Sequence, residues 1–173
     1  MGADNTEQAV ADAGPLIHLN EIASLSLLSV FDEVHMTSVV WAEATLPNRV
    51  KATYLAALPY LRQHRVVNNV AAHFVLDANL SSLHFGEQTS LFLAHELGVA
   101  PFLTDDLAAR EAAKSLGLRP VGSLGVIARA CVKSLVNVES AVELMRSLQR
   151  HSSLFVTDQI VELAIQTLYR QFK

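Results

Sequence analysis

Short apolar runs alternate along the chain with longer segments in which apolar residues recur every three or four positions. Runs of strand length are found at residues 8–12, 34–37, 99–104 and 119–121, with a weaker one at 65–67. Helical spacing is found at residues 16–28, 38–44, 48–63, 87–97, 107–116, 124–132, 141–148 and 157–172. Strands that alternate with helices predict an α/β domain whose central sheet is mainly parallel.

Glycine and proline mark several of the expected element ends. Gly14 and Pro15 follow the first strand and indicate a turn or a helix start. Gly98 and Gly117 come directly after two of the helical segments, where glycine often ends a helix. Pro59 lies inside the segment 48–63 and predicts that this helix is kinked or divided.

Composition limits the range of functions. The chain has 173 residues, of which 51% are hydrophobic, enough for the core of one ordinary domain. No repeat or linker divides it, so we expect a single domain over residues 1–173. Lys and Arg together number 13 against 17 Asp and Glu, and the pI is about 5.9. This balance argues against a protein that coats nucleic acid, whereas an acidic metal site would lower the charge of a nuclease.

Cysteine content and hydropathy bear on the compartment. Cys131 is the single cysteine, so an intramolecular disulfide is excluded, and its apolar surroundings predict a buried thiol. The apolar runs are shorter than the roughly 18 residues of a membrane span. The start of the chain is polar and acidic, unlike an export signal. We therefore expect a cytoplasmic protein with no membrane partner.

Acidic residues stand where the expected strands end or the next helices begin. Asp12 ends the first strand, and Asp105 and Asp106 follow the strand 99–104. Glu87 opens a helix, and Glu43 lies in the helix after the second strand. Ligands of open parallel sheets gather at the carboxyl ends of the strands. Carboxylates that meet there repel one another without a cation, and their oxygens suit Mg²⁺ or Mn²⁺, which activate water and neutralise a phosphodiester.

Each acid also has a purely structural interpretation. Glu87 suits the positive end of a helix dipole, Asp12 suits a cap of the Gly-Pro turn, and Asp105 suits the N-cap of the helix 107–116. Glu43 suits a solvated helix face. Taken singly, none of these residues specifies a metal site.

Four short motifs resemble, in their order along the chain, those of the PIN-domain family. Residues 10–19 (VADAGPLIHL) resemble its opening strand, which ends in Asp and continues into a small residue, Ser or Gly, and Pro. Residues 38–43 (SVVWAE) and 86–94 (GEQTSLFLA) are similar to the helices that carry its second and third acids. Residues 103–106 (LTDD) are similar to the strand end that carries the fourth. The likeness extends from about residue 9 to about residue 132.

The resemblance implies a three-layer α/β/α fold of the 5′-nuclease type. It also implies an endoribonuclease-like hydrolase that uses Mg²⁺ or Mn²⁺ to cleave RNA. Carried over to this sequence, the metal ligands and catalytic residues are Asp12, Glu43, Glu87 and Asp106. Asp105 is the substitute ligand if the register is displaced by one.

Three further residues are expected to contact the substrate. Thr104 precedes the acids and would position a ligand or water by its hydroxyl, although threonine is also a good strand former. Arg110 and Lys114 are four residues apart on one helix, so they share a face and suit RNA phosphates. The family commonly has a basic or aromatic residue soon after the fourth acid, whereas here residues 107–109 (LAA) follow Asp106 and Arg110 is the first basic residue, which is a departure from its pattern.

The resemblance also suggests partners. Many small members are VapC-type toxins whose antitoxins block the site, and homodimers are common, so we expect RNA, an antitoxin and a second copy as partners. Residues 155–159 (FVTDQ) are similar to the start of a helix in a C-terminal extension of one bacterial and archaeal subfamily, and we assign residues 139–173 to it. The alternative function is a catalytically inactive PIN fold that serves as a scaffold or as an RNA- or protein-binding module.

Overall fold

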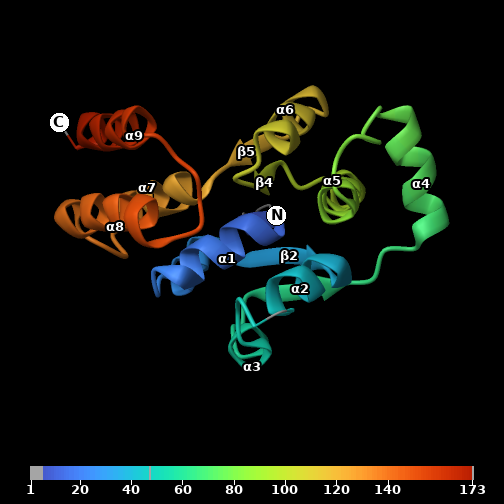
Figure 1. Ribbon diagram of the computed structural model, residues 1–173, viewed down its shortest axis with the longest axis horizontal. Coiled ribbons are helices and arrows are strands. Elements are labelled where there is room, and N and C mark those ends of the chain that lie inside the picture. The colour runs from blue at the N-terminus through green and yellow to red at the C-terminus, as the bar shows by residue number, and fades with distance from the viewer. Residues whose placement is uncertain (1–5, 47, 173) are drawn as a thin grey trace, which may run out of the picture.

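The computed structural model describes residues 6–46 and 48–172, and shows within them a five-stranded sheet with helices on both faces (Figure 1). The strands are β1 (Gln8–Ala11), β2 (Glu33–Thr37), β3 (Leu61–His64), β4 (Pro101–Leu103) and β5 (Arg119–Val121). All of their pairings are parallel, in the order β3-β2-β1-β4-β5. The predicted α/β/α fold with a parallel sheet is therefore confirmed.

Helices connect the strands and cover both faces of the sheet. They are α1 (Ala13–Glu21), the 3₁₀ helix η1 (Leu25–Val30), α2 (Ser38–Thr45), α3 (Ala52–Ala56), α4 (Asn68–Asp77), α5 (Phe85–Leu97), α6 (Leu107–Ser115), α7 (Ser123–Val132), α8 (Val138–His151) and α9 (Asp158–Gln171). Figure 1 shows α8 and α9 on one side of the molecule and α4 and α5 on the other. Gly98 ends α5 with a φ of 64°, the left-handed cap that its position predicts.

The central strand β1 divides the core into two layers. Successive side chains of a strand point to opposite faces. Ala9 and Ala11 accordingly belong to the core cluster that includes residues of α1, α7, α8 and α9, whereas Val10 belongs to the cluster that includes residues of α5 and α6. All three are fully buried. The continuous apolar run that predicted this strand reflects its burial on both faces.

The two C-terminal helices join the core through one face each. The buried residues of α8 and α9 belong to the same cluster as those of α1 and α7: Ala141, Met145, Leu148, Val161, Ile165 and Leu168. The predicted helices at 141–148 and 157–172 are thus present, each with slightly different ends. The boundary of an extension at residue 139 stays a prediction, and of the predicted domain 1–173, residues 1–5, 47 and 173 lie outside the described residues.

The segment between β2 and α5 differs from the prediction. Residues 48–63 were expected to be helical, but only α3 is, and the chain reaches β3 at Leu61, soon after Pro59. The strand predicted at 65–67 is wrong, because residues 61–64 form it instead, in register with residues 34–37 of β2. β3 is an edge strand whose side chains are partly or fully exposed, so its sequence lacks the apolar run of a buried strand. Helix α4 was not predicted.

Among residues 6–46 and 48–172, no helix combines the length and the apolar composition that crossing a bilayer requires.

Candidate metal-binding cleft

The sheet brings the ends of β1 and β4 together at the point where the strand order reverses. β1 connects outward to β2 on one side, and β4 to β5 on the other, so the carboxyl ends of β1 and β4 form the crevice in which such sheets bind ligands. The backbone N–H of Asp12 donates to the carbonyl oxygen of Leu103 at 2.9 Å, which joins the two strand ends directly. Asp12 then serves as the N-terminal boundary residue of α1.

Two of the predicted acids lie deep in this crevice. Asp12 is only 6% exposed and Glu87 only 7%. The buried hydroxyl of Thr104 lies 3.4 Å from Oδ2 of Asp12 and accepts the backbone N–H of Asp106 at 3.2 Å. Oε2 of Glu87 accepts the backbone N–H of His84 at 2.9 Å, within the first turn of α5. Thr104 therefore positions Asp12, and the helix start positions Glu87.

The other two acids lie at the mouth of the crevice and are exposed to solvent. The backbone N–H of Gly86 hydrogen-bonds to the carboxylate of Glu43. The approach is so close that a Cβ built on Gly86 would clash with both carboxylate oxygens of Glu43, lying 2.7 Å from Oε1. Oδ1 of Asp106 accepts the backbone N–H of Ala109 at 2.8 Å and so caps α6. Asp106, not Asp105 as the structural interpretation had it, is the N-cap of this helix.

All four acids line a single cleft of about 750 Å³. They enter it from α1, α2, α5 and the start of α6, although they are far apart in the sequence. The cleft is also lined by Gly14, Ile17, His18, Arg49, His84, Phe85, Asp105, Leu107, Ser153, Leu154 and Phe155. The structure thus brings together the carboxylates that the sequence motifs single out.

The carboxylates raise one another's pKa values. Burial raises the pKa of Asp12 from 3.8 to about 7, and the charges of Glu87 and Glu43 add to this effect. The pKa values of Glu87 and Glu43 are also raised, in both cases chiefly by burial. For Glu87, the charges of Asp106 and Glu43 contribute further. The cluster is therefore strained electrostatically when no cation neutralises it.

A divalent cation suits this set of donors. Among the described residues, no three His, Cys, Asp or Glu side chains lie close enough to one another to hold one metal ion together. The donors are nonetheless all carboxylate oxygens, which hard cations prefer, and their raised pKa values mean that a positive charge would stabilise them. Glu43 and Asp106 line the same cleft, and their exposure leaves both carboxylates accessible to a cation from solvent.

Asp105 has a different place from its neighbour. Its Oδ1 accepts the backbone N–H of Ser123 at 2.7 Å, and its Oδ2 accepts the Ser123 hydroxyl at 2.5 Å and pairs with Nδ1 of His18 at 2.8 Å. The side chain is 8% exposed. Asp105 therefore ties α1 and the start of α7 to the end of β4, and both of its oxygens are already hydrogen-bonded.

The residues predicted to contact substrate are divided between several places. A guanidinium nitrogen of Arg110 donates to the carbonyl oxygen of Thr104 at 3.3 Å, beside the cleft. The ammonium of Lys114 bonds to Glu111 at 2.7 Å on the exposed side of α6 and does not line the cleft. Two other basic residues, Arg129 and Lys133, both pair with Glu7.

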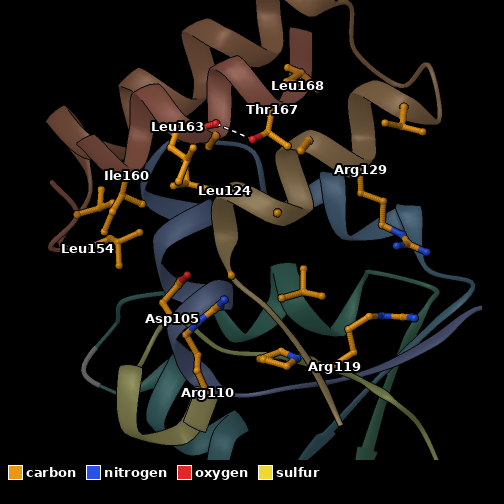
Figure 2. A pocket seen from close by; sticks show the side chains of 18 of the residues that line it. Asp105, Arg110, Arg119, Leu124, Arg129, Leu154, Ile160, Leu163, Thr167 and Leu168 are labelled. Carbon is orange, nitrogen blue, oxygen red and sulfur yellow. Dashed lines mark hydrogen bonds between the residues drawn. The ribbon is translucent and has the colours of Figure 1, made fainter. Parts of the chain in front are cut away.

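A larger apolar groove of about 1510 Å³ adjoins the cleft. It runs between β5, α7 and α9, and shares Asp105, Leu107, Leu154 and Phe155 with the cleft. Figure 2 shows the apolar side chains of Leu124, Leu154, Ile160 and Leu163 at one end of it, with Asp105 and Arg110 below them.

Sequence reasoning missed several residues of the cleft, namely Arg49, His84, Phe85 and Phe155. His84 and Phe85 directly precede the Gly86-Glu87 pair, so their nearness to a predicted acid was a usable signal. Arg49 and Phe155 adjoin none of the predicted acids, so the sequence offers no comparable signal for them.

Comparison with known proteins agrees with this geometry. The search of curated proteins returns no significant match. A family model described as a PIN domain matches residues 8–170, which is nearly the whole chain. The parallel sheet, the position of the cleft and this match together show that the chain belongs to the PIN-domain family.

Proposed function

We propose that this protein is a divalent-metal-dependent ribonuclease that hydrolyses RNA phosphodiester bonds. The observation that carries the proposal is the convergence of Asp12, Glu43, Glu87 and Asp106 on one cleft at the switch point of the sheet. PIN domains are generally nucleases, so family membership supports hydrolysis of nucleic acid, and the carboxylate cluster supports dependence on a metal.

The buried and the exposed acids would have different roles in this site. Asp12 and Glu87, held by Thr104 and by the first turn of α5, would form the fixed floor of an Mg²⁺ or Mn²⁺ site. Glu43 and Asp106 would complete it from the mouth. A bound cation supplies neutralisation of the phosphodiester and a water of lowered pKa. Burial of the floor strengthens these charge interactions, because few water molecules reach it.

A cleavage assay tests the proposal. Unstructured RNA is incubated with the pure protein and manganese, with and without EDTA, and with the variants Asp12→Asn and Asp77→Asn. Asp77 is exposed at the end of α4 and lines neither hollow, so its variant makes the same chemical change away from the cleft. We expect cleavage by the wild type and by Asp77→Asn, and none with the chelator or with Asp12→Asn.

Intact RNA with folded wild-type protein and manganese would instead favour the inactive scaffold. The homodimer, the antitoxin and the toxin role that the resemblance implies are separate proposals with their own tests. Light scattering of the purified chain tests the first. Arrest of cell growth on induction, relieved by a co-expressed partner, tests the other two.

A further inference from the structure

Exposed apolar side chains surround the mouth of the acidic cleft. Phe155 is 93% exposed, Leu107 is 73% exposed and Phe85 is 49% exposed, and all three line the cleft. Single exposed apolar residues are common on protein surfaces and need no explanation. Two aromatic rings that line one carboxylate cleft from different parts of the chain, the start of α5 and the α8–α9 loop, are a more specific arrangement.

The loop that carries Phe155 is anchored on both sides of the ring. The backbone N–H and the hydroxyl of Ser153 donate to Oε2 of Glu21 at 2.6 and 3.0 Å. On the other side, the amide of Gln149 donates to the carbonyl oxygen of Val156 at 3.3 Å. The exposure of Phe155 is therefore a fixed feature of the loop, which holds the ring in solvent beside the cleft.

Positive charge is available on the same side of the molecule. Arg49 lines the cleft, and Arg110 lines the adjoining groove beside Asp105, which borders both the groove and the cleft (Figure 2). Neither forms an ion pair with an acid in the described part of the chain, in contrast to Arg129 and Lys133, which both pair with Glu7. Arg110 uses one guanidinium nitrogen to bond to Thr104, so Arg110 and Arg49 both keep donors for RNA phosphates.

We propose that Phe155 is a stacking platform for an unpaired base of single-stranded RNA, with Phe85 as a second platform. This inference rests on the proposed function, and it adds the side chains that would bind the unpaired bases. A ring can stack on the face of a base only where the base is not already stacked in a duplex. The rings would stack on the bases of a single strand, and the arginines would contact its flanking phosphates. The carboxylates would reach the scissile phosphate through a bound cation.

The test measures binding and not cleavage. A labelled single-stranded RNA of about ten nucleotides is titrated in calcium, its integrity is checked afterwards, and affinity is read from fluorescence anisotropy. The variants are Phe155→Ala, Phe155→Leu and Phe155→Trp, with Phe172→Ala as the matched control. Phe172 is also an exposed ring, 51% exposed, but it lines only the apolar groove.

We expect Phe155→Ala and Phe155→Leu to weaken binding about 5- to 150-fold, the range typical of one base–aromatic stack. Phe155→Trp keeps the wild-type affinity, and Phe172→Ala leaves it unchanged. An RNA of the same length with abasic positions should bind the wild type weakly. Its affinity for Phe155→Ala should equal its affinity for the wild type, because no base is left to stack on the ring. A duplex of the same sequence binds less tightly than the single strand.

Three results would overturn the inference. They are no RNA binding by the wild type, equal RNA binding by Phe155→Ala and the wild type, or a Phe155→Ala variant that loses self-association and not RNA binding. The last would assign the ring to a protein interface. Failure of the proposed function is distinguishable, because RNA that binds through Phe155 but is never cleaved in manganese refutes the nuclease and leaves the platform standing. Because Phe155 is almost fully exposed, its variants should melt like the wild type, which circular dichroism checks.

Discussion

Replacing Asp12 with Asn should stabilise the metal-free protein near neutral pH while destroying its response to metal. The folded chain holds the Asp12 proton more tightly than the unfolded chain, since burial raises the pKa of this carboxyl from 3.8 to about 7. Below about pH 3.8 both states carry the proton, and the full stability is present. As the pH rises, the unfolded chain ionises first, so the free energy of unfolding falls until the pH passes about 7.

The size of the effect follows from the same pKa values. A tenfold change in an equilibrium constant is worth about 1.4 kcal/mol, so a rise from 3.8 to about 7 corresponds to a loss of about 4 kcal/mol. Stabilities of single domains are only about 5 to 15 kcal/mol, so this loss is large. In a domain of this size it corresponds to a melting temperature lower by about 8 to 16 °C.

Asparagine has nearly the same shape as aspartate and still accepts the Thr104 hydrogen bond, but it has no charge to desolvate. With EDTA at about pH 8, we therefore expect Asp12→Asn to melt higher than the wild type, and at about pH 4 the two should converge. Adding manganese should raise the melting temperature of the wild type and not that of the variant, because the variant lacks one of the two buried carboxylates that would hold the ion.

The assay is thermal unfolding followed by circular dichroism between about pH 4 and 8.5, in chelator and in manganese. Glu96→Gln is the matched control. Glu96 is exposed on α5, so removing its charge should not change the pH dependence. Parallel pH profiles for the wild type and Asp12→Asn in chelator would refute the reasoning, because they would mean that the Asp12 carboxyl is well solvated.

Two further predictions concern neighbouring residues. Gly86→Ala should push the Glu43 carboxylate out of the cleft and weaken manganese binding, measured by calorimetry, about 10- to 100-fold. The control Gly14→Ala should not weaken it, because its added Cβ meets nothing closer than 3.6 Å. Equal manganese affinities of Gly86→Ala and the wild type would contradict the role of Glu43. Asp105→Ala should lower the urea-unfolding free energy by about 3 kcal/mol with or without metal, because it leaves buried donors unpaired; a loss seen only with manganese would instead make Asp105 a ligand.

The parts of the fold that could be predicted are those buried on both sides. Strand β1 shows in the sequence because it is central, so its residues from Ala9 to Ala11 are apolar and buried. Strand β3 pairs with one neighbour only and exposes Arg62 and Gln63, so its extended form depends on pairing with β2, which the local sequence does not record. Helix α4 has no side-chain hydrogen bond at its N-cap, Val67, and so lacks a start signal.

The candidate site divides in the same way. Its acids could be predicted because each lies in a local motif: Asp12, Glu87 and Asp106 at strand or helix ends, and Glu43 within the helix after β2. The position of Phe155 could not, because it depends on contact between Ser153 and Glu21, which are 132 residues apart in the chain. Tertiary contacts of this kind set the path of the loop, and neither the composition nor the local sequence predicts them.

The adjacent acids Asp105 and Asp106 show why a displacement of one residue matters chemically. Successive residues of an extended segment point to opposite sides, so two neighbouring carboxylates meet different surroundings. Asp105 meets three donors at 2.5 to 2.8 Å from Ser123 and His18, which use both of its oxygens for structure. Asp106 gives Oδ1 to the α6 cap, and its charge acts on Glu87. Cation binding needs carboxylates that the protein has not already neutralised, and this is the property that separates Asp106 from its neighbour.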